Sequence, residues 1–104
     1  MNRESGLEVT RRKQARGAVL GLLDDSYPTG IAYMVLERLL ADAGKAQAHE
    51  LPGIMHYLED KGYIAITVPE EPTLKPLGNG VVELRAHGMD LLEGSIPEDP
   101  GVLL

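Results

Sequence analysis

Polar residues at helical spacing in the middle of the chain form its clearest candidate for molecular recognition. His49, Gly53, His56 and Asp60 recur every three to four residues, so a helix would carry them on one side. Such a side can lie in the major groove of DNA, where histidine can donate to guanine N7 or to a phosphate. Gly53 would let the helix approach closely, and Gln47 at the helix start can pair with an adenine edge. The two histidines, Gly53 and Gln47 are therefore candidate DNA contacts.

Acidic residues on or beside the same side oppose this interpretation. Glu50, Glu59 and Asp60 would each repel a phosphate. No arginine or lysine stands where base recognition most often uses one. The alternative is a solvated helix side on an acidic domain that binds other proteins, and the spacing leaves both interpretations open.

The charge of the chain is polarised along its length. The formal net charge is −6, yet residues 1–16 contain five basic and only two acidic side chains. Most of the basic residues belong to one cluster, Arg11, Arg12, Lys13 and Arg16. This basic cluster is the best candidate for contact with a DNA backbone. The alternatives are a role in solubility, or pairing with Asp24, Asp25 or the acidic end of the chain.

A further candidate for backbone contact lies in the proline-rich loop of residues 69–80. Lys75 is its only cation, and Asn79 belongs to a Gly-Asn-Gly turn signal. Glu70 and Glu71 oppose contact with phosphate. Lys75 and Asn79 are included among the candidate DNA contacts, although a single loop lysine is more often simply solvated.

The remaining reactive residues indicate neither an enzyme nor a metal site. The chain has no cysteine, and His49 and His56 would lie about 10 Å apart along a helix, too far for one metal ion. His87 belongs to another predicted element. No H-E-x-x-H pattern, glycine-rich phosphate loop or nucleophile elbow occurs. We therefore expect no metal, no cofactor and no catalytic residue.

The helix that would position the histidines ends at Gly62. Its apolar side has the spacing i, i+3, i+4 and i+7 and consists of Leu51, Ile54, Met55 and Leu58. Pro52 falls early in this helix, where its missing donor costs little. Lys61 followed by Gly62 is typical of a helix end. Residues 63–68 are rich in β-branched side chains and predict a strand, and residues 81–84 predict the return strand.

Two further helices are predicted before this one. Thr10 is expected to cap a helix over residues 10–25, and Thr29 a second helix over residues 30–43 that Gly44 ends. The predicted apolar side of the first helix comprises Ala15, Ala18, Val19, Leu22 and Leu23. The predicted core side of the second comprises Ala32, Val35, Leu36, Leu39, Leu40 and Ala43.

The second of these helices is apolar on two sides, because Ile31 and Met34 fall opposite its predicted core side. In a small domain the second neighbour can be another subunit. This predicts a homodimer with Ile31 and Met34 in the interface. The alternative is that the N-terminal segment, with Leu7 and Val9, folds over this helix.

Residues 86–93 predict a fourth helix, with Met89 and Leu92 facing the core and Gly94 at its end. The residues that follow contain two prolines and two acids before an apolar end, Val102, Leu103 and Leu104. We expect an extended tail whose apolar end docks on a partner or is disordered.

A chain of 104 residues is long enough for one small domain with a single core. We expect a flexible N-terminus over residues 1–9, a domain over residues 10–94 and an extended tail over residues 95–104. The N-terminus has no apolar segment typical of a signal peptide, and no apolar run approaches membrane-spanning length. The absence of cysteine suits a reducing cytoplasm.

Two motifs carry a resemblance to a known family. The run YLEDKGYI resembles the end of a recognition helix, and LRAHGMDLLEG resembles the start of the helix that follows a wing. Residues 51–94, which contain both motifs, resemble winged-helix DNA-binding domains. The chain looks closest to small winged-helix proteins of Mu-like phages and prophages. The expected fold class is α+β, a winged helix in the order α–α–α–β–β–α, with a helix-turn-helix core of three helices and a β-hairpin wing.

Together with the composition and the two-sided apolar helix, the resemblance leads us to expect a cytoplasmic protein that binds double-stranded DNA as a homodimer. Its expected function is transcription regulation of phage or prophage type. The alternative function is an acidic winged-helix module that binds other proteins and does not bind DNA.

Overall fold

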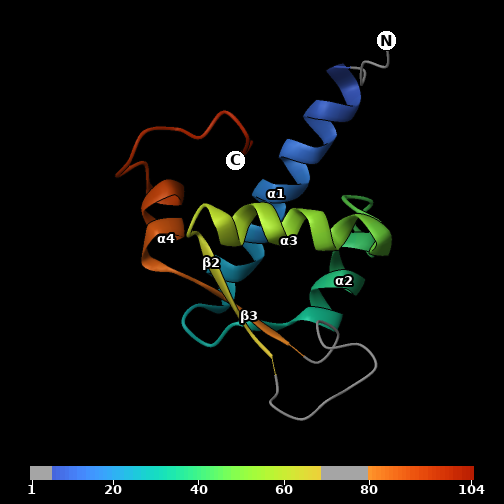
Figure 1. Ribbon diagram of the computed structural model, residues 1–104, viewed down its shortest axis with the longest axis horizontal. Coiled ribbons are helices and arrows are strands. Elements are labelled where there is room, and N and C mark those ends of the chain that lie inside the picture. Colours follow the sequence, from blue (N-terminus) through green and yellow to red (C-terminus); the bar gives the residue numbers. More distant parts are fainter. Residues whose placement is uncertain (1–5, 69–79) are drawn as a thin grey trace.

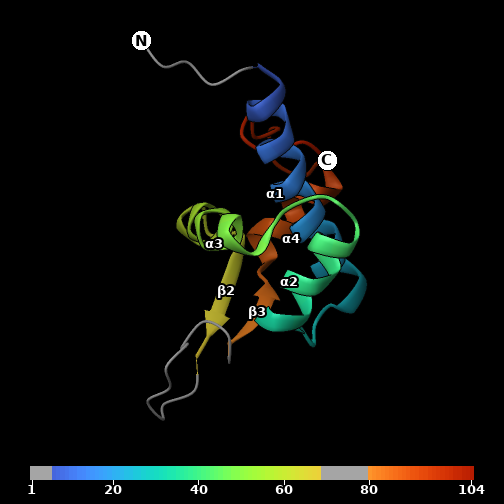
Figure 2. The ribbon, with the colours of Figure 1, turned by 90° about the vertical axis from the view of Figure 1, so that its right-hand side faces the viewer.

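The computed structural model describes residues 6–68 and 80–104, which form an α+β fold (Figure 1). Four α-helices surround a small three-stranded antiparallel sheet. The elements in chain order are α1 (Gly6–Ser26), β1 (Ile31–Ala32), α2 (Tyr33–Asp42), a 3-10 turn η1 (Ala48–Glu50), α3 (Leu51–Asp60), β2 (Ile64–Thr67), β3 (Val81–Leu84) and α4 (Ala86–Glu93). Figures 1 and 2 show α3 crossing α1, with β2 and β3 extending from the end of α3 as an antiparallel pair.

The structure confirms the predicted helix over α3 and the two strands that follow it. All four residues of the predicted apolar side of α3 are buried, and Pro52 lies in the first helical turn. Gly62 has φ +77°, and its N–H donates to the carbonyl of Glu59, as expected at a helix end. β2 then pairs antiparallel with β3, with Ile64 opposite Leu84. The proline-rich loop between the two strands lies outside the described residues.

The short strand β1 corrects the predicted start of the second helix. Residues 31 and 32 pair with β3, with Ile31 opposite Val82, so the sheet order is β1-β3-β2. Gly30 has φ +85°, and a side chain there would meet the carbonyl of Val82. This close approach of the backbone to β3 favours strand pairing over another helical turn. The predicted cap at Thr29 is therefore wrong, and Ala32 precedes α2 without a side-chain cap.

α1 is longer than the sequence predicts. It begins at Gly6, within the described residues, so Leu7 and Val9 continue the helix and do not fold over α2. Thr10 is consequently an interior residue and not a cap. Leu20 is also fully buried, although the predicted apolar side omits it, whereas Ala18 and Leu22 are only partly buried.

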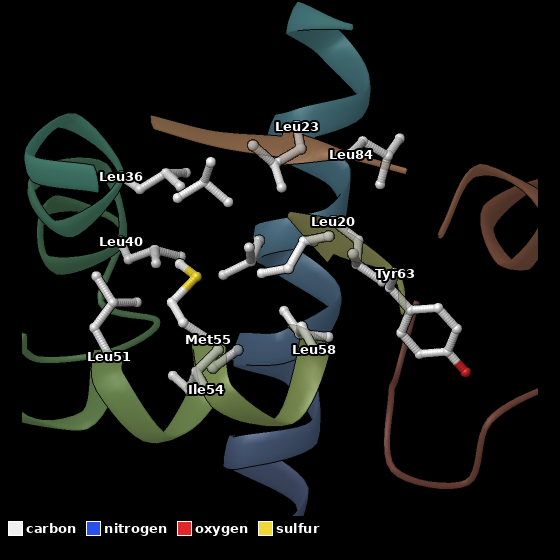
Figure 3. Close-up of a cluster of buried hydrophobic side chains, with 14 of the residues drawn as sticks. Leu20, Leu23, Leu36, Leu40, Leu51, Ile54, Met55, Leu58, Tyr63 and Leu84 are labelled. Carbon is white, nitrogen blue, oxygen red and sulfur yellow. The ribbon is translucent and has the colours of Figure 1, made fainter. Parts of the chain in front are cut away.

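The core lies where α1, α2 and α3 meet the sheet (Figure 3). α1 contributes Leu20 and Leu23, and α2 contributes Leu36 and Leu40. α3 contributes Leu51, Ile54, Met55 and Leu58. No phenylalanine or tryptophan exists in this chain, so Tyr63 supplies an aromatic ring at the edge of this cluster.

The buried side of α2 is narrower than predicted. Tyr33, Leu36 and Leu40 are buried, at the spacing i, i+3 and i+7. Val35 and Leu39, which the sequence assigns to the core, are 49% and 40% exposed. Ala32 and Ala43 are also exposed, in contrast to the prediction. The helix starts at Tyr33, which is also the first residue of its buried side.

α4 lies where the sequence predicts it and ends at Gly94, which has φ +75°. Leu91 is its most buried side chain, while Met89 and Leu92 are partly buried against the core. Gly88 is packed against the carbonyl of Tyr63, so a side chain at this position would overlap the backbone. The close packing of α4 against the backbone at Tyr63, just before β2, therefore depends on a glycine.

The segment after α4 folds back onto the domain, which corrects the expectation of an end that is disordered or docked on a partner. Val102 is buried, and the N–H of Leu103 donates to the carbonyl of Lys13 in α1. The carbonyl of Leu103 occupies the space that a side chain at Gly17 would need. The segment therefore packs directly on the α1 backbone.

Asp99 anchors this segment through a buried carboxylate. It accepts hydrogen bonds from the Tyr63 hydroxyl at 2.7 Å, the Tyr57 hydroxyl at 3.1 Å and the Gly101 N–H at 2.7 Å. The guanidinium of Arg16 stacks 3.9 Å from the centre of the Tyr57 ring and donates to the Gly101 carbonyl at 3.0 Å. The tail, α1, α3 and the start of β2 are thus joined by one polar cluster.

The protonation of this cluster follows from its contacts. Burial on its own would raise the pKa of Asp99, but the hydrogen bonds from Tyr63, Gly101 and Tyr57 outweigh it and hold the pKa below its ordinary value. Burial, together with the hydrogen bond to Asp99, raises the pKa of Tyr63 to about 12. The ionised carboxylate and the neutral phenol are therefore the forms that favour folding.

Leu58→Ala should reduce the free energy of unfolding by about 2–5 kcal/mol, because Leu58 is fully buried between the helices and the sheet. Chemical denaturation followed by circular dichroism measures the loss. A matched truncation at Leu7, which is 79% exposed, should change stability little. An unchanged midpoint for Leu58→Ala would contradict the packing of α3.

Asp99 should make stability depend on pH in the acidic range. Its pKa is lower in the folded state, so its contribution is present above the ordinary carboxyl pKa and is lost as pH falls through the folded value. Asp99→Ala should cost about 1–3 kcal/mol at neutral pH, because it leaves the Tyr63 hydroxyl without its acceptor. Urea denaturation at several pH values would measure both effects, with the exposed neighbour Glu98→Ala as control. Equal acid sensitivity in the parent and Asp99→Ala would contradict this role.

Candidate nucleic-acid interface

The exposed side of α3 carries the residues that the sequence singles out. Gly53 and His56 are exposed, opposite the four buried apolar residues of the helix. The side chain of His56 is 76% exposed, and its Nε2 lies 3.2 Å from Oδ2 of Asp60. A side chain at Gly53 would meet nothing within 4 Å. This side of α3 is therefore smooth at Gly53 and polar on either side of it.

The start of α3 is fixed by a local hydrogen-bonded turn. Gln47 and Glu50 form a capping box around η1, in which the Gln47 N–H donates to the Glu50 carboxylate at 3.0 Å. Gln47 and His49 are both exposed. The Glu50 N–H donates in turn to the Gln47 backbone carbonyl at 3.0 Å, so two hydrogen bonds between these residues close the turn.

A bidentate ion pair between Arg11 and Glu50 joins the basic cluster to the start of α3. Arg11 places Nη1 2.7 Å and Nη2 2.8 Å from the two carboxylate oxygens of Glu50, across a separation of 39 residues. The hydrogen bonds from Arg11 and from the Gln47 backbone hold the pKa of Glu50 below its ordinary value. Glu50, which the sequence presents as a charge that repels phosphate, is therefore neutralised locally by Arg11.

A groove of about 500 Å³ opens between the first half of α1 and η1. The residues that line it are Glu8, Arg11, Arg12, Gln47, His49 and Glu50. Its lining is polar and mixed in charge, and it adjoins the exposed side of α3. The groove brings two members of the basic cluster beside Gln47 and His49, which the sequence alone does not place together.

The other two members of the basic cluster lie away from this groove. Arg16 packs on Tyr57 and bonds to the tail, so its guanidinium is committed within the domain. Lys13 is partly buried, and its carbonyl accepts from Leu103. The predicted pairing of the cluster with Asp24 or Asp25 is not among the described ion pairs. Lys75 and Asn79, the two loop candidates, lie outside the described residues.

The third histidine and the acidic side chains do not converge on a metal. His87 belongs to α4 and not to α3, and it stacks on the Tyr63 ring with 5.2 Å between ring centres. In residues 6–68 and 80–104, no three histidine, cysteine, aspartate or glutamate side chains come together as a group of metal ligands.

Comparisons with protein-family models, curated proteins and solved structures found no match to this chain. Across the part of the chain that the structure describes, no helix combines the length and the apolar character that crossing a membrane requires.

Gly53→Ala should test whether the fold itself requires a glycine on the exposed side of α3. Glycine weakens a helix by up to about 1 kcal/mol relative to alanine, and the structure leaves open space for the added methyl group. The variant should therefore unfold at a slightly higher temperature than the parent. Differential scanning calorimetry measures the shift, and a lower melting temperature would mean that Gly53 is required by the fold.

Proposed function

We propose that this protein is a winged-helix protein that binds double-stranded DNA, with the exposed side of α3 in the major groove, and acts as a transcription regulator of phage or prophage type. The order of the helices, the hairpin that follows α3 and the resemblance of residues 51–94 support the proposal. In this arrangement Gly53 permits close approach, while His49 and His56 meet base edges or phosphates.

The observation that carries the proposal is the ion pair between Arg11 and Glu50. An unpaired carboxylate at the start of a recognition helix would repel the DNA backbone. The pairing removes this obstacle and holds the basic first half of α1 beside α3. Arg12 lines the same groove as His49, and Glu8 and Glu50 also line it, so the basic side chains of α1 meet the start of α3 in a groove of mixed charge.

The charges at the far end of α3 limit how strong such binding can be. Glu59 and Asp60 are exposed there, and His56 is within ion-pair distance of Asp60. Because these acids repel phosphates within about one Debye length, roughly 10 Å at 0.1 M salt, they should weaken DNA binding most at low salt. Backbone attraction must therefore come from α1 more than from α3.

The two halves of the Arg11–Glu50 pair should have opposite effects on DNA binding. Glu50→Gln removes a negative charge and releases Arg11 to contact phosphate, so affinity should rise and the slope of log K against log salt should steepen by about 0.9. Arg11→Ala exposes the Glu50 charge, so affinity should fall. Fluorescence anisotropy with labelled duplex DNA, from about 50 mM salt upward, measures both changes.

This comparison separates electrostatics from structure, because both substitutions break the same ion pair and a purely structural role would move affinity in one direction. Arg38→Ala is the matched control. It also breaks an exposed ion pair, with Asp42 on α2, and should leave the salt slope unchanged. Absence of binding by the parent chain at about 50 mM salt would reject DNA binding.

The alternative function is an acidic module that binds other proteins. The exposed acids at the end of α3 support this alternative, because they can attract a basic partner. This alternative would be favoured if the parent chain does not bind DNA but is retained by a basic protein surface in a salt-dependent manner.

A further inference from the structure

A groove between α1 and α2 exposes apolar surface that the fold itself does not cover. Leu39 and Ala43 line it from α2, and Ala18, Gly21 and Leu22 line it from α1. Its volume is about 620 Å³. The sequence pattern assigns both Leu39 and Ala43 to the core, but the structure leaves both exposed. An apolar side of this helix is therefore available to a partner.

Apolar exposure continues beyond both walls of the groove. Val35, one helical turn before Leu39, extends it along α2 and is 49% exposed. An adjoining hollow of about 510 Å³ shares Ala18 and is lined by Leu103 and Leu104, of which Leu104 is 66% exposed. A contiguous apolar surface of this kind is more typical of an interface than of an isolated domain.

Gly21 lines the groove, and neither its backbone conformation nor its contacts within the domain require a glycine. A side chain at Gly21 would meet nothing within 4 Å, and Gly21 has no positive φ. Glycine nevertheless weakens a helix interior relative to alanine. Close approach of another backbone would account for it, because only a missing side chain leaves that space.

Charges at the two ends of the groove identify the occupant. Lys45 lies at the end near Ala18, since both residues also line the adjoining hollow. Asp24 and Asp25 line the groove further along α1, and seven residues of helix separate Ala18 from Asp25 by about 10 Å. The groove therefore has a positive end and a negative end. A two-fold axis across its centre would place each Lys45 against the aspartates of the other copy.

We propose that the groove between α1 and α2 is the interface of a homodimer, in which a second copy of this chain packs its own groove against it around a two-fold axis. This interface differs from the one predicted on Ile31 and Met34. Ile31 lies in β1 and packs against the core, and Met34 is not among the residues that line the groove. The proposal does not rest on DNA binding. Figure 2 shows α1 and α2 on one side of α3, so the dimer would leave the exposed side of α3 accessible.

Charge reversal tests the two-fold arrangement directly. The parent chain should sediment as a dimer at roughly 100 μM. Lys45→Glu alone and Asp25→Lys alone place like charges together and should each raise the dissociation constant roughly tenfold or more. An equal mixture of the two variants should recover the dimer, because each reversed charge then meets its opposite across the interface.

The control is Glu93→Lys, which makes the same change in charge as Asp25→Lys at an exposed position on α4 outside the groove. It should dimerise as the parent does. Circular dichroism of every variant checks that the fold is retained, and Lys45 and Asp25 are both exposed. A monomeric parent, a dimer insensitive to both reversals, or a mixture that stays monomeric would each overturn the proposal.

Discussion

A buried carboxylate determines how the parts of this fold are held relative to α3. A charge away from water is tolerated only when hydrogen bonds replace its hydration, and Asp99 obtains them from Tyr57, Tyr63 and the Gly101 N–H. Tyr57 belongs to α3 and Tyr63 precedes β2, so one group fixes the end of α3 against both the sheet and the tail. Arg16 extends the cluster to α1 by stacking on Tyr57. The orientation of the side of α3 that faces solvent therefore depends on contacts at the C-terminal end of this helix.

The parts of the fold that could be predicted from the sequence are those that local patterns determine. The apolar side of α3, its end at Gly62 and the strands on either side of the loop each depend on residues within one or two helical turns. β1 could not be predicted, because a two-residue strand has no period and exists only by pairing with β3, about fifty residues later. The inner side of α2 was misassigned for a related reason, since Val35 and Leu39 have the spacing of core residues but are exposed, and Leu39 lines a groove.

The candidate site divides in the same way. The exposure of Gly53 and His56 could be predicted, because helical spacing alone separates them from the buried residues. The ion pair of Arg11 with Glu50 could not, because it joins residues far apart in the chain and no periodic pattern links them. The availability of Arg16 was also mispredicted. Its place in a basic run suggests a cation that is free to bind DNA, but it stacks on Tyr57 and donates to the Gly101 carbonyl. Composition therefore locates the charge, but only tertiary contacts decide which charges are available.

The packing of Leu103 on Gly17 has a consequence for the order of events during synthesis. Roughly 86 residues separate the two positions, and at about 5–20 residues per second the ribosome needs roughly 4–17 s to make the intervening chain. During that interval the backbone of α1 at Gly17 remains uncovered, and Arg16 lacks the carbonyl that it later contacts. α1 is thus made well before the segment that covers it, so a nascent chain would leave this part of α1 open to chaperones during that interval.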